Sequence, residues 1–414
     1  MKFNKDWLQG QLLDRFLRYV RIETTSDRHS ADFPSTPGQW DLLRMLEREL
    51  RELSTADADL NEDGFLVCRL PASRGFEQSP VIGFMAHVDT TQEVTAHGVR
   101  PQVHSEYDGK SIEIANGLVL SPENFPELLK YRGETIITTD GATLLGADDK
   151  AGVAEIMTAV SWLVSHEEIK HGEIEIIFTP DEETGKGMDR FPVSNLKSEC
   201  CYTLDGDVEG SVEAECFNAY KADISFTGKS IHPGTARGKL VNAVTMAGAF
   251  TSMLPRNESP EATDGRFGFY LPLEIKGDAE NSWLSIYIRD FEIDEINRRL
   301  TGLEKIGKAV ESMFDGGTVS IETEKQYVNM RNSLEKNPKI VDLLIEAVKR
   351  TGIEPILKAI RGGTDGARLC EMGIPTPNIF TGGQNYHSRL EWAGLPTMAK
   401  AVEVIVHLAV LWAE

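Results

Sequence analysis

Residues 173–185 read Glu173-Ile174-Glu175-Ile176-Ile177-Phe178-Thr179-Pro180-Asp181-Glu182-Glu183-Thr184-Gly185, an apolar segment that runs straight into three consecutive carboxylates. β-Branched side chains dominate the apolar part, and Pro180 ends it because proline cannot donate a hydrogen bond to a neighbouring strand. The pattern predicts a strand over residues 174–179 with the carboxylates at the edge of a sheet. Adjacent carboxylates repel one another unless a cation lies among them, and divalent cations take such oxygen ligands. An acidic run alone is more often a solvated turn, so a metal site needs support from elsewhere in the chain.

Length and composition bound the class of protein. A chain of 414 residues exceeds what one hydrophobic core usually supports, so we expect two domains. The net charge of −22 argues against binding to nucleic acid or to an anionic membrane. The first residues lack the apolar core of a signal peptide, and we find no apolar run that approaches the roughly 20 residues of a membrane-spanning helix. These features predict a cytoplasmic globular protein.

The five cysteines follow no CxxC spacing, so neither a disulfide framework nor a thiolate zinc site is indicated. We expect them to be reduced and mostly buried. They are Cys68, Cys200, Cys201, Cys216 and Cys370.

The first half of the chain alternates between two periodicities. Helical spacing of apolar residues predicts helices over 7–20, 40–53 and 151–164, the last with Glu155 on its polar face. Short apolar runs predict strands over 66–70, 81–86, 135–139 and 201–204, whereas residues 90–133 show no clear period. This alternation predicts an α/β domain with a mostly parallel sheet covered by helices.

The pattern changes near residue 217. Strands over 220–226, 267–275, 283–288 and 318–322 and helices over 241–254 and 294–314 give the order β-α-β-β-α-β, a ferredoxin-like domain. The first domain resumes with a helix over 339–350, strands over 356–360 and 378–381, and a helix over 397–413. We therefore expect a catalytic domain formed by 1–216 and 334–414, with 217–333 inserted.

Four predicted strands of the first domain lead into potential metal ligands, and carboxyl ends of strands border the ligand crevice of an open α/β sheet. A fifth candidate precedes the helix over 151–164. The candidates are His87, Asp148, Glu182 or Glu183, Asp205 and His387. Singly, each has a simpler explanation: a structural histidine, an N-cap for Asp148 or Asp149, and a turn at Asp205. Together, with Asp89 placed to support His87 as imidazole ligands usually require, they predict a metal site.

The motifs His87-x-Asp89, Asp148-x-Lys150-x-Gly152 and Asp181-Glu182-Glu183-x-Gly185, with Asp205 and His387, resemble the di-zinc M20 metallopeptidase family over the entire chain. More narrowly, the segments 146–152, 178–183, 232–236 and 361–366 resemble the tripeptide aminopeptidases of that family.

The resemblance implies two zinc ions per subunit, with cobalt or manganese as possible substitutes. It implies that His87 and Asp205 hold one ion, that Glu183 and His387 hold the other, and that Asp148 bridges them. Asp89 is then expected to fix the tautomer of His87. Glu182 is expected to be the general base for a water shared by the two ions.

Three residues outside the predicted metal site are expected to contact the substrate. The resemblance implies that His232 stabilises the oxyanion, in relatives from a second subunit, although Pro233 and Gly234 also suit a simple turn. Arg289 is expected to bind the substrate carboxylate, with a salt bridge to Asp290 as the alternative. Arg361 begins a glycine-rich loop suited to close ligand approach or to turn geometry alone.

The expected function is the removal of the N-terminal residue from tripeptides by a cytoplasmic homodimer that pairs through its inserted domain. Two alternatives stay open: another M20 activity, such as a dipeptidase or N-acyl-amino-acid hydrolase, and a non-catalytic metal- or peptide-binding relative. The presence of Glu182 argues against the last, because a binding protein needs no free base beside a metal.

Overall fold

The structure, a computed structural model, describes residues 1–53 and 57–414. The chain forms two compact units. The main unit comprises Met1–Ala214, Asn332–Lys358 and Thr364–Glu414, and the inserted unit comprises Glu215–Arg331 and Ala359–Gly363. Residues 359–363 belong to the inserted unit, although they lie within the range 334–414 predicted for the catalytic domain.

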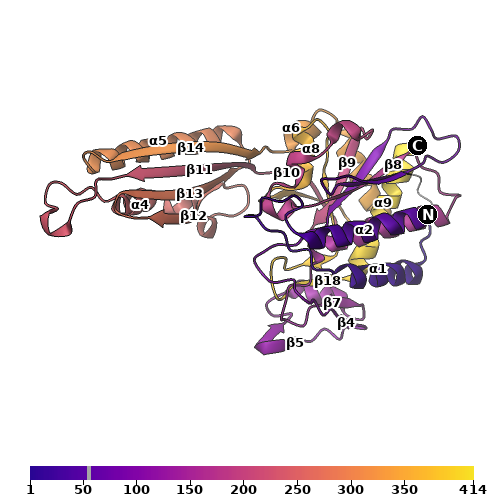
Figure 1. Ribbon diagram of the computed structural model, residues 1–414. Coiled ribbons are helices and arrows are strands. Elements are labelled where there is room, and N and C mark those ends of the chain that lie inside the picture. The colour runs from indigo at the N-terminus through magenta and orange to yellow at the C-terminus, as the bar shows by residue number, and fades with distance from the viewer. Residues whose placement is uncertain (54–56) are drawn as a thin grey trace. The chain divides into compact units, whose positions relative to one another are not determined.

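The main unit is built on an eight-stranded sheet (Figure 1). Its strands, in spatial order, are β1 (Asp57–Leu60), β2 (Leu66–Leu70), β8 (Ile174–Thr179), β3 (Ile82–His87), β9 (Cys200–Gly206), β16 (Asn378–Phe380), β10 (Ser211–Cys216) and β15 (Ile356–Ile360). The four central strands from β8 to β16 run parallel, whereas β1 pairs antiparallel with β2, β2 with β8, and β10 with β16. The sheet is therefore mixed, and the predicted parallel arrangement holds for its centre.

Helices cover this sheet. They are α1 (Lys5–Tyr19), α2 (Pro37–Glu52), α3 (Ala147–Ser165), α7 (Lys339–Arg350) and α9 (Leu395–Ala413), with the short helices α6 (Arg331–Leu334) and α8 (Asp365–Glu371). The helix α8 occupies a stretch that we had assigned to a glycine loop. Helix α3 packs against α1 and α9 as well as against β3 and β9, so it is buried on all sides. Glu155 is consequently fully buried, and its predicted place on a polar face is wrong.

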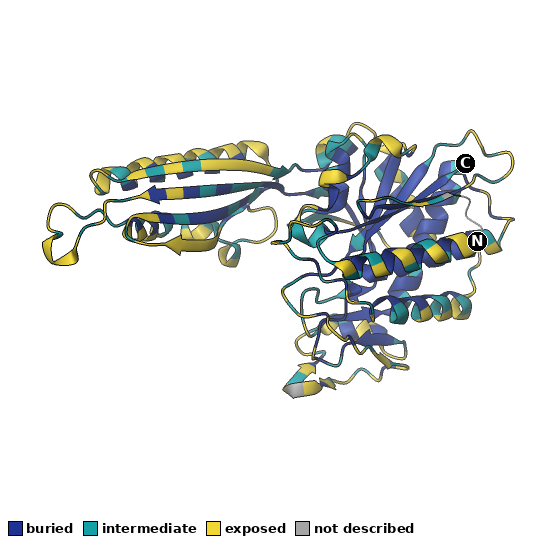
Figure 2. Cartoon of the chain, in the orientation of Figure 1, coloured by how far each residue is buried: buried dark blue, intermediate teal, exposed yellow. Residues whose placement is uncertain are grey.

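One helix corrects the expectation about apolar runs. Helix α9 has 19 residues and a mean hydropathy of 1.5, so by length and composition it could span a membrane. However, 78% of this apolar window is buried within the protein, as the dark blue of α9 shows in Figure 2. Its apolar character is explained by its position in the core.

A second, smaller sheet in the main unit has the order β17 (Gly383–Gln384), β18 (Trp392–Gly394), β7 (Ile136–Thr138) and β4 (Gln102–His104), beside the hairpin of β5 (Ile112–Ile114) and β6 (Leu118–Leu120). Three of these strands lie where no period was detected, because each has only three residues. All five cysteines are buried, as predicted, and none is assigned to a disulfide among the described residues.

The inserted unit is an antiparallel sheet in the order β12 (Phe269–Gly277), β13 (Asn281–Asp290), β11 (Asn218–Thr227) and β14 (Thr318–Tyr327). Helices α4 (Ala243–Ser252) and α5 (Ile293–Met313) pack against it over a core of its own. The predicted β-α-β-β-α-β order is confirmed.

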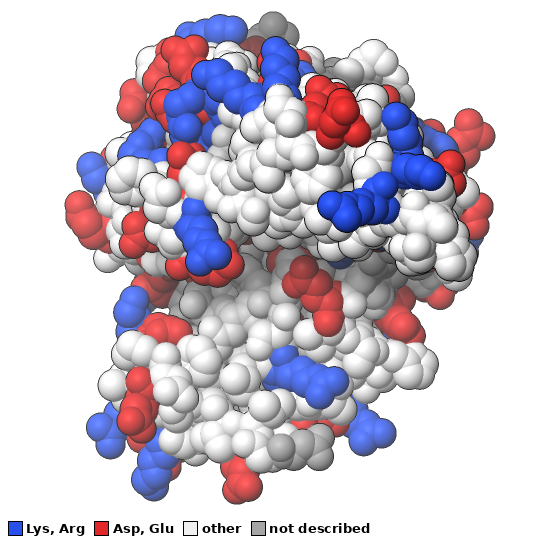
Figure 3. All heavy atoms as spheres, turned by 90° about the vertical axis from the view of Figure 1, so that its left-hand side faces the viewer, with Lys and Arg blue, Asp and Glu red and all other residues white. Residues whose placement is uncertain are grey.

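On the face of the molecule shown in Figure 3, basic and acidic side chains are interspersed, without the basic stripe that a phosphate backbone requires.

Candidate metal centre

The five side chains predicted as metal ligands come together where the central strands end. His87 is the last residue of β3, Asp205 lies near the end of β9, and Glu183 follows β8 in a short 3-10 turn. Asp148 lies at the start of α3, and His387 follows β17. Parallel strands bring these distant residues to one edge of the sheet.

Asp148 lies between the two imidazoles. Its Oδ1 is 3.0 Å from His87 Nε2, and its Oδ2 is 3.2 Å from His387 Nε2. Glu183 Oε1 lies 3.0 Å from His387 Nε2, and Asp205 Oδ1 lies 3.8 Å from His87 Nε2. The cluster thus consists of two groups that share one carboxylate.

Asp89 lies beside His87 Nδ1, the ring nitrogen that does not face Asp148. Its side chain is fully buried, with Oδ1 3.3 Å from His87 Nδ1. Its two oxygens also accept hydrogen bonds from the backbone N–H groups of Glu182 and Glu183, at 3.0 and 3.1 Å. One carboxylate therefore lies against the imidazole and also holds the turn that carries the two glutamates.

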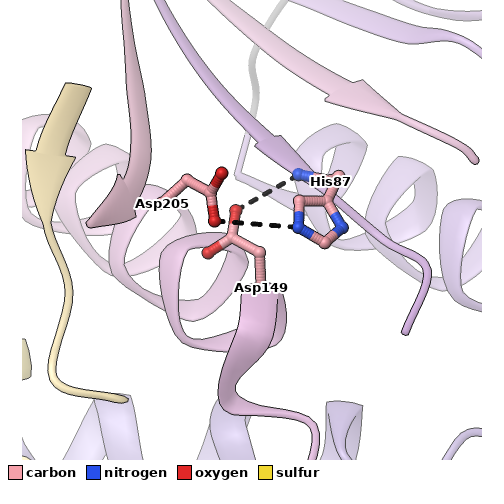
Figure 4. Close-up of side chains that lie close together, drawn as sticks. All are labelled: His87, Asp149 and Asp205. Atoms are coloured by element: carbon pink, nitrogen blue, oxygen red, sulfur yellow. Dashed lines mark hydrogen bonds and ion pairs between the residues drawn. The ribbon is translucent and has the colours of Figure 1, made fainter. Parts of the chain in front are cut away.

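Asp149 has a different task from Asp148. Its Oδ1 accepts the backbone N–H of Gly152 at 3.2 Å, and because the backbones of Asp148 and Asp149 are not helical, it caps the regular part of α3 that follows. Its Oδ2 accepts the backbone N–H of His87, also at 3.2 Å, as Figure 4 shows together with Asp205. The N-cap alternative considered for both aspartates therefore applies to Asp149, and Asp148 is left to face the imidazoles.

Asp181, the first of the three consecutive carboxylates, points away from the cluster. It accepts hydrogen bonds from the backbone N–H of Ser35 and from Gln39 Nε2, each at 2.7 Å, and from the Ser35 hydroxyl. Its backbone is left-handed, with φ 59°. The side chain anchors the loop to the start of α2, while Glu182 and Glu183 remain beside the imidazoles.

Sequence reasoning missed two buried acids at this site. Glu391 is 1% exposed and accepts the backbone N–H groups of residues 145–148 at 2.7 to 3.2 Å, which positions Asp148. Asp365, at the start of α8, accepts the hydroxyl of Thr179 at 2.6 Å and borders a void of about 10 Å³ with His87 and Asp205. The only local signal for Glu391 was the run of free N–H groups ahead of a helix, which favours an anion.

Crowding of acids shifts the protonation of the site. Burial and the neighbouring Asp148 carboxylate together raise the pKa of Glu183 to about 7, although His387 opposes this shift. Burial likewise raises the pKa of Glu182 well above its usual value, although the nearby His87 opposes this shift. Burial lowers the pKa of His387, but the neighbouring Asp148 and Glu183 carboxylates outweigh this effect and bring the value to about 11.

The donor set fits divalent metal ions. Within the described residues, the buried Glu183 Oε1 accepts no hydrogen bond, even though His387 Nε2 lies 3.0 Å away. Imidazole nitrogens and carboxylate oxygens that converge in this way are the ligands that zinc and related metals take. A cation here would also offset the mutual repulsion of the carboxylates.

His232, the first predicted substrate contact, belongs to the inserted unit and is exposed. Its Nδ1 accepts the backbone N–H of Gly234 at 3.1 Å and so caps the short 3-10 turn over Pro233–Thr235. The other ring nitrogen, Nε2, takes no part in this capping hydrogen bond.

Arg289 and Arg361, the other two predicted substrate contacts, make their hydrogen bonds within the inserted unit. Arg289 donates to the carbonyl of Tyr220 at 3.1 Å and lies over the ring of Tyr287, while its expected partner Asp290 pairs with Arg299. Arg361 donates to four oxygen atoms at 2.7 to 3.2 Å, which are Thr263 O, Thr263 Oγ1, Gly265 O and Phe267 O. These contacts hold the guanidinium of Arg361 within the inserted unit.

Comparisons with known proteins place this geometry in a family. Residues 137–410 match the model of peptidase family M20/M25/M40. A peptidase T of Geobacillus thermodenitrificans is 46% identical over 409 residues, which cover 98% of this chain and 99% of that protein.

Solved structures agree on the fold. The aminopeptidase PepT of Bacillus cereus matches 98% of this chain and 99% of its own with a TM-score of 0.76 at 22% identity. A tripeptidase of Staphylococcus aureus matches 98% of both chains with a TM-score of 0.77 at 19% identity. From the cluster at the strand ends, the family model and the relative at 46% identity, it follows that the chain belongs to peptidase family M20.

Proposed function

We propose that this protein is a cytoplasmic aminopeptidase that removes the N-terminal residue of tripeptides and that it works with two zinc ions per subunit. The observation that carries the proposal is the position of Asp148, whose two oxygens each face a different imidazole at 3.0 and 3.2 Å. A carboxylate shared in this way is what two adjacent cations need.

In this proposal His87 and Asp205 hold one metal ion, Glu183 and His387 hold the other, and Asp148 contributes to both. Cobalt or manganese would fit the same mixed nitrogen and oxygen ligands. When bound, the two ions would polarise the scissile carbonyl and lower the pKa of the attacking water.

The proton transfers are assigned to Glu182. Its backbone N–H is fixed by Asp89 at 3.0 Å, while its carboxyl group is left out of the proposed ligand set. Burial raises its pKa, which suits a group that must both accept and donate a proton near neutral pH. Glu182 takes a proton from the water that attacks the carbonyl carbon and returns it to the nitrogen of the leaving amine as the C–N bond breaks.

The substrate class comes from the relatives. A tripeptide substrate is inferred from the names of two relatives. One is the peptidase T that is 46% identical over nearly the whole chain, and the other is the tripeptidase with a TM-score of 0.77. The five buried cysteine thiols are in keeping with a reducing compartment.

A panel of three substrates tests this function: a tripeptide, its N-acetylated form and the corresponding dipeptide. We expect the purified protein with zinc to release the N-terminal residue from the tripeptide and to leave the other two intact. Cleavage of the acetylated peptide in preference to the free one would instead identify an N-acyl-amino-acid hydrolase, and preference for the dipeptide a dipeptidase.

We further propose that two subunits pair through the inserted unit and that His232 donates a hydrogen bond to the oxyanion in the partner's site. Strands β12 and β14 form the edges of the inserted sheet, where another strand could pair, and β12 exposes Leu273 and Ile275. Arg289, half-buried at the end of β13, is proposed to bind the substrate carboxylate.

Subunit mixing tests the proposed dimer. His232→Ala and Glu182→Ala chains, each inactive alone, should regain about a quarter of wild-type activity when mixed and exchanged, because half of the dimers carry one intact site. Confirmed exchange with activity at background would show that His232 acts within its own chain or is structural.

A further inference from the structure

The two imidazoles of the cluster are supported by different kinds of carboxylate. His87 has Asp89 two positions further along the chain, with Oδ1 3.3 Å from its Nδ1. His387 has no acid at that spacing, since the chain continues Ser388-Arg389-Leu390-Glu391. Glu391 is occupied elsewhere, because its two oxygens accept four backbone N–H groups of residues 145–148.

The Nδ1 of His387 instead faces a residue that is distant in sequence but adjacent in the fold. Glu93 Oε2 lies 3.2 Å from His387 Nδ1, across 294 positions of sequence. A carboxylate can only accept, so this contact places a proton on Nδ1 and leaves Nε2, the nitrogen beside Asp148 and Glu183, to bind the proposed metal ion.

His387 needs such a support more than His87 does. His87 ends a buried strand, whereas His387 lies in a turn where it and Asn385 both have left-handed backbones, with φ 57° and 56°. Its side chain is 34% exposed, compared with 3% for His87. Little packing therefore fixes the imidazole of His387.

Glu93 itself is well placed to act as an anchor. Ahead of it in the chain, Thr90 exchanges backbone hydrogen bonds with Thr24 and Ser26 at 3.2 and 3.0 Å. Its neighbour Gln92 donates to Asp27 at 3.1 Å. The segment is thus held at several points, and the side chain of Glu93 extends from it to His387.

We propose that Glu93 is a positioning residue that fixes the tautomer and orientation of His387, as Asp89 is expected to do for His87. The inference rests on the proposed metal site, in which His387 serves as a ligand. Removal of such a supporting carboxylate typically weakens metal binding by 10- to 100-fold. Because Glu93 is 59% exposed, we expect an effect near the lower limit.

The test is a metal titration that needs no turnover. Metal-free protein is titrated with Zn²⁺ in competition with a chromophoric chelator, which gives two dissociation constants for the wild type. Glu93→Ala should weaken one step by about 10-fold and leave the other within about twofold. His387→Ala identifies which step belongs to that ligand, and Glu113→Ala, on the exposed part of β5, is the matched control.

Glu93→Gln separates positioning from charge. The amide oxygen of the glutamine can still accept a hydrogen bond from His387 Nδ1, so positioning by Glu93 predicts dissociation constants near those of the wild type. If Glu93 acted through its charge alone, Glu93→Gln would weaken metal binding as much as Glu93→Ala does. Equal losses in the two variants, or wild-type metal binding in Glu93→Ala, would overturn the inference. So would a raised KM with both dissociation constants unchanged, which would make Glu93 a substrate contact. A wild-type chain that binds no zinc would overturn the proposed function itself.

Discussion

The two units bury charge in opposite ways. In the inserted unit, Arg299 Nη1 donates to Asp290 Oδ2 at 2.5 Å, and its Nε lies 3.0 Å from Glu258. In the main unit, the imidazoles of His87 and His387 face a crowd of acids. Those acids are Asp89, Glu93, Asp148, Glu183 and Asp205.

The difference separates structure from function. A buried pair that neutralises itself holds a fold together at little net gain, and its cost appears when one partner is removed. An excess of buried carboxylates is expensive for the fold and is retained where a cation is bound or a proton is moved. The predictions that follow test whether the two units differ in this sense.

The largest effect is expected from Asp148→Asn. The variant removes the one carboxylate that faces both imidazoles, so both metal ions should be lost together, and activity with them. Elemental analysis after gel filtration measures the loss. Glu183→Gln is the matched variant and should lose one ion; a firmly held single ion in Asp148→Asn would rule out a shared ligand.

Glu182→Gln should separate catalysis from metal binding. Without a group to move the proton, turnover of a tripeptide should fall by about 10²- to 10⁴-fold. Metal content should stay at the wild-type level, because the glutamate is not in the proposed ligand set. Steady-state kinetics and elemental analysis on one preparation give both values, and the loss of about one ion per chain would contradict this role.

Arg299→Met should destabilise the inserted unit and spare the metals. It leaves the carboxylate of Asp290 buried without its partner, which costs about 3–5 kcal/mol. Urea denaturation followed by fluorescence measures this loss. The double variant with Asp290→Leu should recover much of it; if the single variant instead lowered zinc content at full stability, the contrast between the units would fail.

The smallest effect concerns pH and His407, a buried residue of α9. Burial lowers its pKa from 6.5 to about 4, so the folded protein favours the neutral ring. The resulting stability is present above pH 6.5 and is lost as the pH falls toward 4, because the unfolded chain binds the proton first. Between pH 7 and pH 5, His407→Gln should lose about 1–2 kcal/mol less than wild type in urea titrations. Parallel losses in the two proteins would contradict this assignment.

Local pattern and topology explain what the sequence could reveal. His87, Glu183 and Asp205 could be predicted because each follows an apolar run typical of a strand. When such strands pair in parallel, their carboxyl ends lie at the same edge of the sheet. Glu93, Asp365 and Glu391 could not be found in this way, because each acts on a partner more than 180 positions away. Glu155 was misplaced because helical periodicity assumes one solvent face, which α3 lacks.

The division of the chain limits how these enzymes can be recombined. The inserted unit is not one continuous block, because residues 359–363 belong to it as well as Glu215–Arg331. Ile360 accepts the backbone N–H of Phe217 at 3.2 Å, and the guanidinium of Arg361 lies 5.1 Å from the ring of Phe217. An exchange that moves only the longer piece between relatives would therefore leave hydrogen bonds and a cation–π contact unmatched. Modular shuffling of this unit requires both pieces of chain to travel together.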